Sequence, residues 1–195
     1  YIVEMMITTV IAVIVLISLV VLWLLKTLGV FKTISIQITQ PPFKQLTIVY
    51  KFQRGSYSKA GDIFNDIAKY SSSLDKLGIY YDHPKVVPVE KRRFAVGAIV
   101  DEIKDRELIE QMEKNNYKVF KLPEFDRSVY TVFPFKNILS IFIAVMKVPY
   151  RLGDYIQAKK IEAHPFLEIY KRPLIHFVVP LSDFDAYNVP EIINE

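Results

Sequence analysis

The longest apolar run in the chain extends from Ile7 to Leu25, and none of its positions is charged. A helix of this length, rising about 1.5 Å per residue, is long enough to cross a hydrocarbon core of about 30 Å. Trp23 lies near one end of the run, where interfacial tryptophans are common. The pattern therefore predicts one membrane-spanning helix from Ile7 to Leu25, with the lipid bilayer as its partner.

A cleaved signal peptide is the alternative interpretation of this run. Signal peptides have a shorter apolar stretch, about 7–15 residues, that follows basic residues. Here Glu4 precedes the run, whereas Lys26, Lys32 and Lys44 all follow it. We therefore favour a retained anchor. Because basic flanks stay on the cytosolic side, we expect a lumenal N-terminus and a cytosolic domain.

After this run, apolar and polar positions alternate in some segments and recur every three or four residues in others. Alternation predicts strands, and the longer period predicts helices. The predicted strands are residues 34–40, 46–53, 76–84, 92–100, 117–125 and 128–135, and a hairpin over 163–180. Residues 117–125 and 128–135 are expected to pair with each other. The predicted helices are residues 57–72, 105–115 and 136–161.

The order of these elements predicts an α+β fold. If the polar helix at 105–115 is treated as a connector, both halves read strand, helix and then two strands, which suggests a pseudo-twofold arrangement. We divide the chain into an anchor with its flanks (residues 1–31), one cytosolic domain (32–190) and the start of a C-terminal tail (191–195).

The helix predicted at 136–161 begins with a run of apolar or small residues from Ile138 to Met146. This run is too short to span a bilayer. Burial in the core explains it best, and contact with the membrane surface or with a partner is the alternative. Pro149 is expected to kink or restart the helix.

Composition narrows the function classes. The formal net charge is +4, but the basic residues are scattered, and the densest group is Lys91, Arg92 and Arg93. Nucleic-acid surfaces usually show a clustered basic stripe with interleaved aromatic residues, so we expect no nucleic-acid partner. The chain has no cysteine, which excludes disulfides and thiolate chemistry and agrees with a cytosolic domain.

No pattern of catalytic residues is visible. There is no Gly-x-Ser-x-Gly motif and no glycine-rich phosphate loop. His83, His164 and His176 are far apart in the sequence, and we expect His176 to be a satisfied strand residue. We therefore expect no enzyme activity, no cofactor and no metal site.

One acidic residue occupies an unusual position. Glu168 alternates with Phe166 and Tyr170 on one face of a predicted strand. It is either an exposed edge-strand carboxylate, paired with a neighbouring basic residue, or the acid of a pocket. Strand tyrosines such as Tyr80 and Tyr170 could wall a cleft for a cationic or amphipathic ligand. The alternation alone leaves both interpretations open, because the hairpin register is unknown.

Several segments together resemble a known family. They are YKFQRGSYSKAGDIF, IYYDHPKVVPVEKRRFAVGAIV, YKVFKLP, VFPFKNILSIFIAV, DYIQAKKIEAHPFLEIY and IHFVVPLSDFDAYNVPE. Their order and spacing from Leu46 to Glu191 resemble the testis-expressed protein 264 family, which consists of single-pass endoplasmic reticulum proteins.

The resemblance implies a gyrase-inhibitor-like cytosolic domain built from tandem strand–helix–strand–strand units. In bacterial relatives of this fold, a Glu-x-Tyr strand supplies an acid to a ligand cleft between the units. Glu168 and Tyr170 match that pair here, so Glu168, Tyr170 and Tyr80 are the candidate ligand-binding residues. A retained cleft acid should have a hydrogen-bonding or cationic partner, because an unpaired buried carboxylate is costly.

The resemblance also implies a function. It suggests an endoplasmic reticulum receptor or adaptor for reticulophagy, which binds ubiquitin-like autophagy modifiers through a tail expected beyond Glu195. Valosin-containing protein is a further implied partner. The alternatives are an accessory subunit of a larger membrane complex, for example in lipid transfer, and a small-molecule or lipid-binding module. A hydrolase is the weakest alternative, because only one candidate acid stands out.

Overall fold

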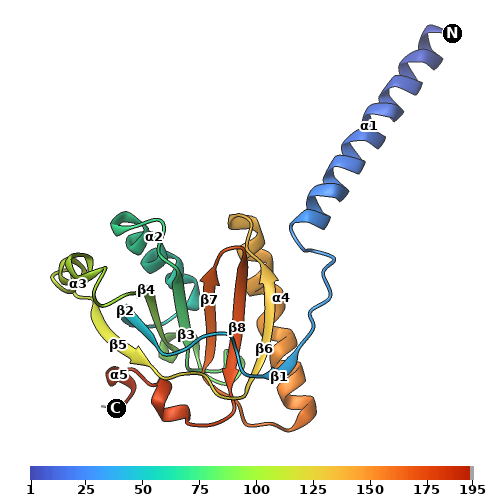
Figure 1. Cartoon of the computed structure of the whole chain (residues 1–195). Coiled ribbons are helices and arrows are strands. Elements are labelled where there is room, and N and C mark those ends of the chain that lie inside the picture. Colours follow the sequence, from blue (N-terminus) through green and yellow to red (C-terminus); the bar gives the residue numbers. More distant parts are fainter. Residues whose placement is uncertain (194–195) are drawn as a thin grey trace.

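The computed structural model describes residues 1–193, so the last two residues of the expected tail, 194 and 195, lie outside the described part. The described chain is an α+β protein with one eight-stranded sheet and an N-terminal helix that extends away from it (Figure 1). All the strand pairs in the sheet are antiparallel.

The elements lie close to their predicted positions. The strands are β1 (Gln37–Thr39), β2 (Leu46–Arg54), β3 (Lys76–Tyr80), β4 (Arg93–Val100), β5 (Lys118–Leu122), β6 (Ser128–Pro134), β7 (Phe166–Lys171) and β8 (Leu174–Pro180). The α-helices are α1 (Ile2–Thr27), α2 (Ala60–Tyr70), α3 (Arg106–Glu113), α4 (Ile138–Lys159) and α5 (Pro190–Ile193). Short 3-10 helices are η1 (Tyr57–Lys59), η2 (Val89–Lys91) and η3 (Phe184–Tyr187).

The strand order is β1-β6-β8-β7-β3-β4-β2-β5. Its central part is symmetric about the β3–β7 pair, because β6-β8-β7 on one side matches β2-β4-β3 on the other. Each half also carries a helix between its first and second strands, α2 in one and α4 in the other. Gly78 of β3 faces Glu168 of β7 at the middle of this central pair.

The expected pairing of residues 117–125 with 128–135 is wrong. Both segments contain strands, but β5 pairs with β2 and β6 lies between β1 and β8, towards the opposite edge of the sheet. The connection between them carries Phe125, whose side chain is fully buried in the core on one face of the sheet. A long connection that crosses the face of the sheet can bury this ring, whereas a tight hairpin could not, so the burial of Phe125 favours the long connection.

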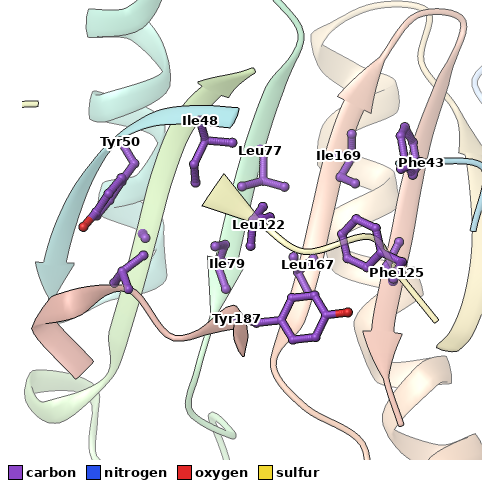
Figure 2. Packing of buried hydrophobic residues seen from close by; sticks show 13 residues of the cluster. Phe43, Ile48, Tyr50, Leu77, Ile79, Leu122, Phe125, Leu167, Ile169 and Tyr187 are labelled. Carbon is purple, nitrogen blue, oxygen red and sulfur yellow. The ribbon is translucent and has the colours of Figure 1, made fainter. Parts of the chain in front are cut away.

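The two faces of the sheet are covered in different ways. Helices α2 and α4 cover one face, through Ile63 and Ile67 on α2 and Val148 and Leu152 on α4 (Figure 1). Side chains from loops and η3 cover the other face. Figure 2 shows the most prominent of them packed over the strands: Phe43, Phe125 and Tyr187.

Helix α4 differs from its prediction in two respects. It begins at a capping box in which the Asn137 side chain accepts from the Ser140 backbone N–H, and it continues without interruption through Pro149. The expectation that Ile138–Met146 is buried is wrong for four of its nine residues, which are exposed. Only one side of the helix packs on the sheet, so Ile138 and Phe142 are 76% and 60% exposed.

The segment after α1 is attached to the domain. Gly29, with φ +83°, lies so close to Phe133 that an added Cβ would be 2.9 Å from the ring. The Lys147 amine on α4 donates hydrogen bonds to the backbone carbonyls of Val30 and Lys32, at 2.9 and 2.7 Å. The end of α1 is therefore held beside β6 and α4.

Candidate functional site

The three predicted ligand-binding residues meet at the centre of the sheet. Glu168 lies in the middle of β7, opposite Gly78 of β3, and side chains of paired residues in antiparallel strands share a face. Tyr170, two residues further along β7, packs in the core under α4, and Tyr80 of β3 packs against the core under α2. Glu168 therefore lies on the helix-covered face, between the two halves of the domain.

Two phenols hold the carboxylate. The Tyr170 hydroxyl donates to Glu168 Oε2 at 2.5 Å, and the Tyr80 hydroxyl is also hydrogen-bonded to Glu168. Glu168 is 5% exposed and Tyr170 is 7% exposed. The structure thus rules out the interpretation of Glu168 as an exposed edge-strand acid, and it supplies the hydrogen-bonding partners that a buried carboxylate needs.

Gly78 provides the space for this arrangement. A Cβ at this position would lie 2.9 Å from both Cε2 and the hydroxyl oxygen of Tyr80, so only glycine lets that ring lie over the strand beside Glu168. Gly78 was not among the residues predicted from the sequence to form the site. The available signal was a glycine inside the predicted strand LGIYY, because such glycines often mark a close approach of other groups.

A second layer of aromatic rings fixes the two tyrosines. Phe64 of α2 and Phe135 contact the Tyr170 ring edge-on, with centroid distances of 5.1 and 6.1 Å. Tyr57 contacts the Tyr80 ring edge-on at 4.9 Å. Phe64 packs against the cores under both α2 and α4, so it joins the two halves directly over the site.

Burial dominates the electrostatics of the site. It raises the pKa of Glu168 to about 7, although hydrogen bonds from Tyr170 and Tyr80 lower it. Burial and the neighbouring carboxylate raise the pKa of both phenols well above the usual value. Both tyrosines are therefore donors at neutral pH, and Glu168 exchanges a proton in that range. An organic cation could replace that proton only if the covering rings moved aside.

The described hollows lie elsewhere. One, of about 540 Å³, is lined mainly by the β5–β6 connection and η3 and includes Asp126, His164 and Phe184. Another, of about 370 Å³, lies where α1 meets the domain and includes Lys26, Lys32 and Lys136. Neither includes Glu168. Within residues 1–193, no group of three or more acidic or histidine side chains is placed to hold a metal ion.

His176 fulfils the expectation of a satisfied strand residue. It is 8% exposed, and its Nδ1 is 2.7 Å from the Tyr130 hydroxyl. Burial lowers its pKa to about 4, so the ring is neutral near pH 7. It lies opposite Ile169 on the face that does not carry Glu168, and it therefore takes no part in the site.

The predicted span Ile7–Leu25 lies inside α1, none of whose side chains is buried. Among the described helices, α1 alone is both long and apolar enough to cross a bilayer. A signal sequence near the N-terminus can pass the same test of length and composition, so the structure shows a candidate membrane helix and no more.

Comparison with known proteins identifies curated relatives. The chain is 36% identical over 167 residues to the mouse protein "Testis-expressed protein 264 homolog", and equally so to human "Testis-expressed protein 264". The match covers 84% of this chain and 54% and 53% of those proteins, so the chain spans about half the length of the curated relatives it matches. No family model matches the chain.

Solved structures give a weaker likeness. An uncharacterized conserved protein from Listeria innocua is 10% identical, with a TM-score of 0.47 over 77% of this chain and 93% of that one. A hydrolase from the same organism is 10% identical, with a TM-score of 0.43 over 81% of this chain and 98% of that one. Likenesses at this level carry no argument about activity.

Proposed function

The chain belongs to the testis-expressed protein 264 family, and on this premise we propose that it is a receptor or adaptor anchored in the endoplasmic reticulum membrane. Helix α1 is the anchor, and the folded domain lies in the cytosol. The observation that carries the proposal is the 36% identity over 84% of the chain.

The charge distribution around α1 supports this orientation. Lys26 and Lys32 follow the apolar run directly, while Glu4 lies at its other end. Basic residues flanking a span remain on the cytosolic side, so the domain after α1 is cytosolic. The N-terminal residues before the span are then lumenal.

We assign the domain to the gyrase-inhibitor-like fold and give it a non-catalytic role. The symmetric strand order about β3 and β7, with one helix in each half, supports this assignment. Glu168 is closed off by Tyr170 and Tyr80, and both phenols are hydrogen-bonded to its carboxylate. In this proposal, the domain presents partners to the membrane and does not transform a substrate.

The family resemblance supplies the partners of this proposal. They are the ubiquitin-like autophagy modifiers, bound through a short motif in a tail, and valosin-containing protein. The letters FLEI from Phe166 to Ile169 fit such a motif, but they form β7 at the centre of the sheet, where Leu167 and Ile169 are buried. We therefore place modifier binding outside the folded domain.

A ligand-binding module is the second candidate function, and the Glu168 site favours it. A buried acid between two phenols, under rings from two halves of the domain, is an arrangement that could receive an organic cation. The thermal midpoint of the full chain should then rise with a cationic amphiphile, and the rise should disappear in Glu168→Gln. An unchanged midpoint in both proteins would remove this candidate.

The receptor proposal is tested by purifying the tagged full-length protein from its own cells in a mild detergent and identifying what co-purifies. Recovery of autophagy modifiers, lost when residues beyond Glu195 are removed, is the expected result. A large membrane protein in fixed stoichiometry would instead make the chain an accessory subunit. That result would overturn the receptor proposal.

A further inference from the structure

Helix α4 exposes a continuous row of large apolar side chains. Its members are Ile138 (76% exposed), Leu139 (55%), Phe142 (60%), Met146 (58%) and Tyr150 (60%). Spacings of four residues place most of them along one side of the helix. The opposite side of the helix packs on the sheet through residues such as Ala144 and Val148. The exposed row, which we call the α4 apolar row, therefore does not contribute to the core. Exposed apolar rows of this kind mark an interaction surface.

The α4 apolar row begins next to the end of α1. Ile138 follows the end of β6 by a few residues, and Gly29 packs against Phe133 at that same end of β6. Phe31, which is 61% exposed, belongs to the segment that Lys147 fastens to α4. From there the helix runs back along the sheet, away from α1 (Figure 1). The first part of the row is therefore the part nearest to the bilayer that α1 enters.

The chain segments that form this region carry charges of one sign. No Asp or Glu occurs between residues 5 and 61 or between residues 127 and 153, which include the end of α1, β1, β6 and the first half of α4. Lys26, Lys32 and Lys136 line the hollow of about 370 Å³ between α1 and the domain, together with Phe31 and Pro134. This combination of exposed apolar side chains and unopposed lysines matches the headgroup region of a phospholipid bilayer, where apolar groups enter and ammonium groups meet phosphates.

We propose that the first half of α4, with Phe31, lies in the headgroup region of the bilayer that α1 crosses, and that Lys26, Lys32 and Lys136 contact lipid phosphates. The domain is then held against the membrane by a second attachment in addition to α1. Ile138, Leu139 and Phe142 enter deepest, and Tyr150 lies nearest to water. The proposal rests on the anchor proposed above.

The test uses the full chain in vesicles of phosphatidylcholine and phosphatidylserine. Because the chain has no cysteine, each single-cysteine variant carries one fluorophore at a known place. Leu139→Cys reports on the row and Val13→Cys on α1. Ser182→Cys is the control, because it is exposed and follows β8 at the end of the sheet opposite to Gly29. Brominated lipids quench only fluorophores that reach the bilayer.

We expect strong quenching at positions 13 and 139, weaker quenching at Tyr150→Cys and none at 182. Quenching at 13 without quenching at 139 overturns the inference and leaves the anchor intact. Absence of quenching at both 13 and 139 overturns the anchor as well. Equal quenching at 139 and 182 also overturns the inference, because the domain then meets the bilayer without a preferred face.

The lysines provide an independent test in the Leu139→Cys background. Lys32→Gln and Lys136→Gln should each lower, about fivefold, the ratio of domains held against the bilayer to domains away from it on anionic vesicles, as read from the quenching at position 139. Lys104→Gln is the matched control, because its side chain is 83% exposed near α3. The same loss with Lys104→Gln, or no loss with the other two variants, would show that lipid phosphates are not contacted by the lysines of the hollow.

Discussion

At the scale of single residues, Glu168 is a carboxylate that burial makes hard to ionise. Its pKa of about 7 in the folded chain exceeds the ordinary glutamate value of 4.5, so the folded state binds a proton more tightly than the unfolded state between these two values. The contribution of this group to stability is therefore fully present below pH 4.5 and is lost as the pH rises through 7.

Replacing Glu168 by glutamine should remove this dependence. We expect the free energy of unfolding of the full chain in detergent to fall by about 3 kcal/mol between pH 4.5 and pH 8 because of Glu168, and Glu168→Gln to abolish that part of the slope. Denaturant unfolding monitored by circular dichroism at several pH values measures it. Glu107→Gln, an exposed residue on α3, is the control, and an equal change of slope there would contradict the assignment.

The Tyr170 hydroxyl should contribute more to stability when Glu168 is present than after Glu168→Gln. Tyr170→Phe removes the 2.5 Å hydrogen bond to Glu168, and we expect it to cost about 1–3 kcal/mol at pH 8, where the carboxylate is charged. The cost should shrink in the Glu168→Gln background, as a double-mutant cycle would show. Tyr150→Phe, at an exposed tyrosine of α4, should cost nothing measurable. Equal costs in both backgrounds would mean that the hydroxyl acts independently of Glu168.

Gly78 should be intolerant of even one added carbon. Gly78→Ala places a Cβ 2.9 Å from the Tyr80 ring, and we expect a loss of about 1–3 kcal/mol in unfolding free energy. Gly61→Ala is the matched control, because that helical glycine has no atom within 4 Å of an added Cβ. It should stabilise the chain by about 0.5–1 kcal/mol. A harmless Gly78→Ala would show that Tyr80 has another place to lie.

At the scale of elements, the sequence was sufficient for the positions of strands and helices and insufficient for their neighbours. The periods of apolar residues located α2, β2 and the β7–β8 hairpin within a few residues. They could not show that β5 and β6 lie towards opposite edges of the sheet, because strand pairing over a distance depends on the packing of loops such as the one that carries Phe125.

The same limit explains what was predicted for α4 and for Glu168. An apolar run such as Ile138–Met146 does not say which side will meet the sheet, and an alternating strand does not say which face the helices will cover. Alternation correctly grouped Glu168 with Tyr170. Its burial, and the approach of Tyr80 over Gly78, depend on the β3–β7 register, which only the structure gives.

The start of α4 is fixed locally, and this can be measured. Asn137 caps the helix by accepting from the Ser140 backbone N–H at 3.0 Å, and the buried Ser140 hydroxyl completes the capping box. Asn137→Ala should cost about 1 kcal/mol of unfolding free energy, whereas Asn137→Ser keeps a capping oxygen and should cost much less. Equal losses in the two variants would point to a role of Asn137 other than capping.

At the scale of the whole molecule, the two ends of the sheet, taken along the direction of its strands, carry different surfaces. The end of β6 that receives α1 carries the lysine-lined hollow and the start of the α4 apolar row. Beyond β8, Asp183 and Asp185 join Asp126 around an acidic hollow at the other end. A basic end towards the membrane and an acidic end away from it fit a protein whose orientation on an anionic surface is fixed by charge.

The topology of the chain can be tested by cysteine labelling without background, because the chain has no cysteine. In sealed microsomes, whose outer face is cytosolic, we expect a membrane-impermeant maleimide to modify Ser182→Cys at once. Val3→Cys, on the short segment before the span, should react only after the membrane is permeabilised. The reverse pattern would place the domain in the lumen, where cytosolic autophagy modifiers and valosin-containing protein cannot reach it. Immediate reaction at both positions would show that α1 does not cross the membrane.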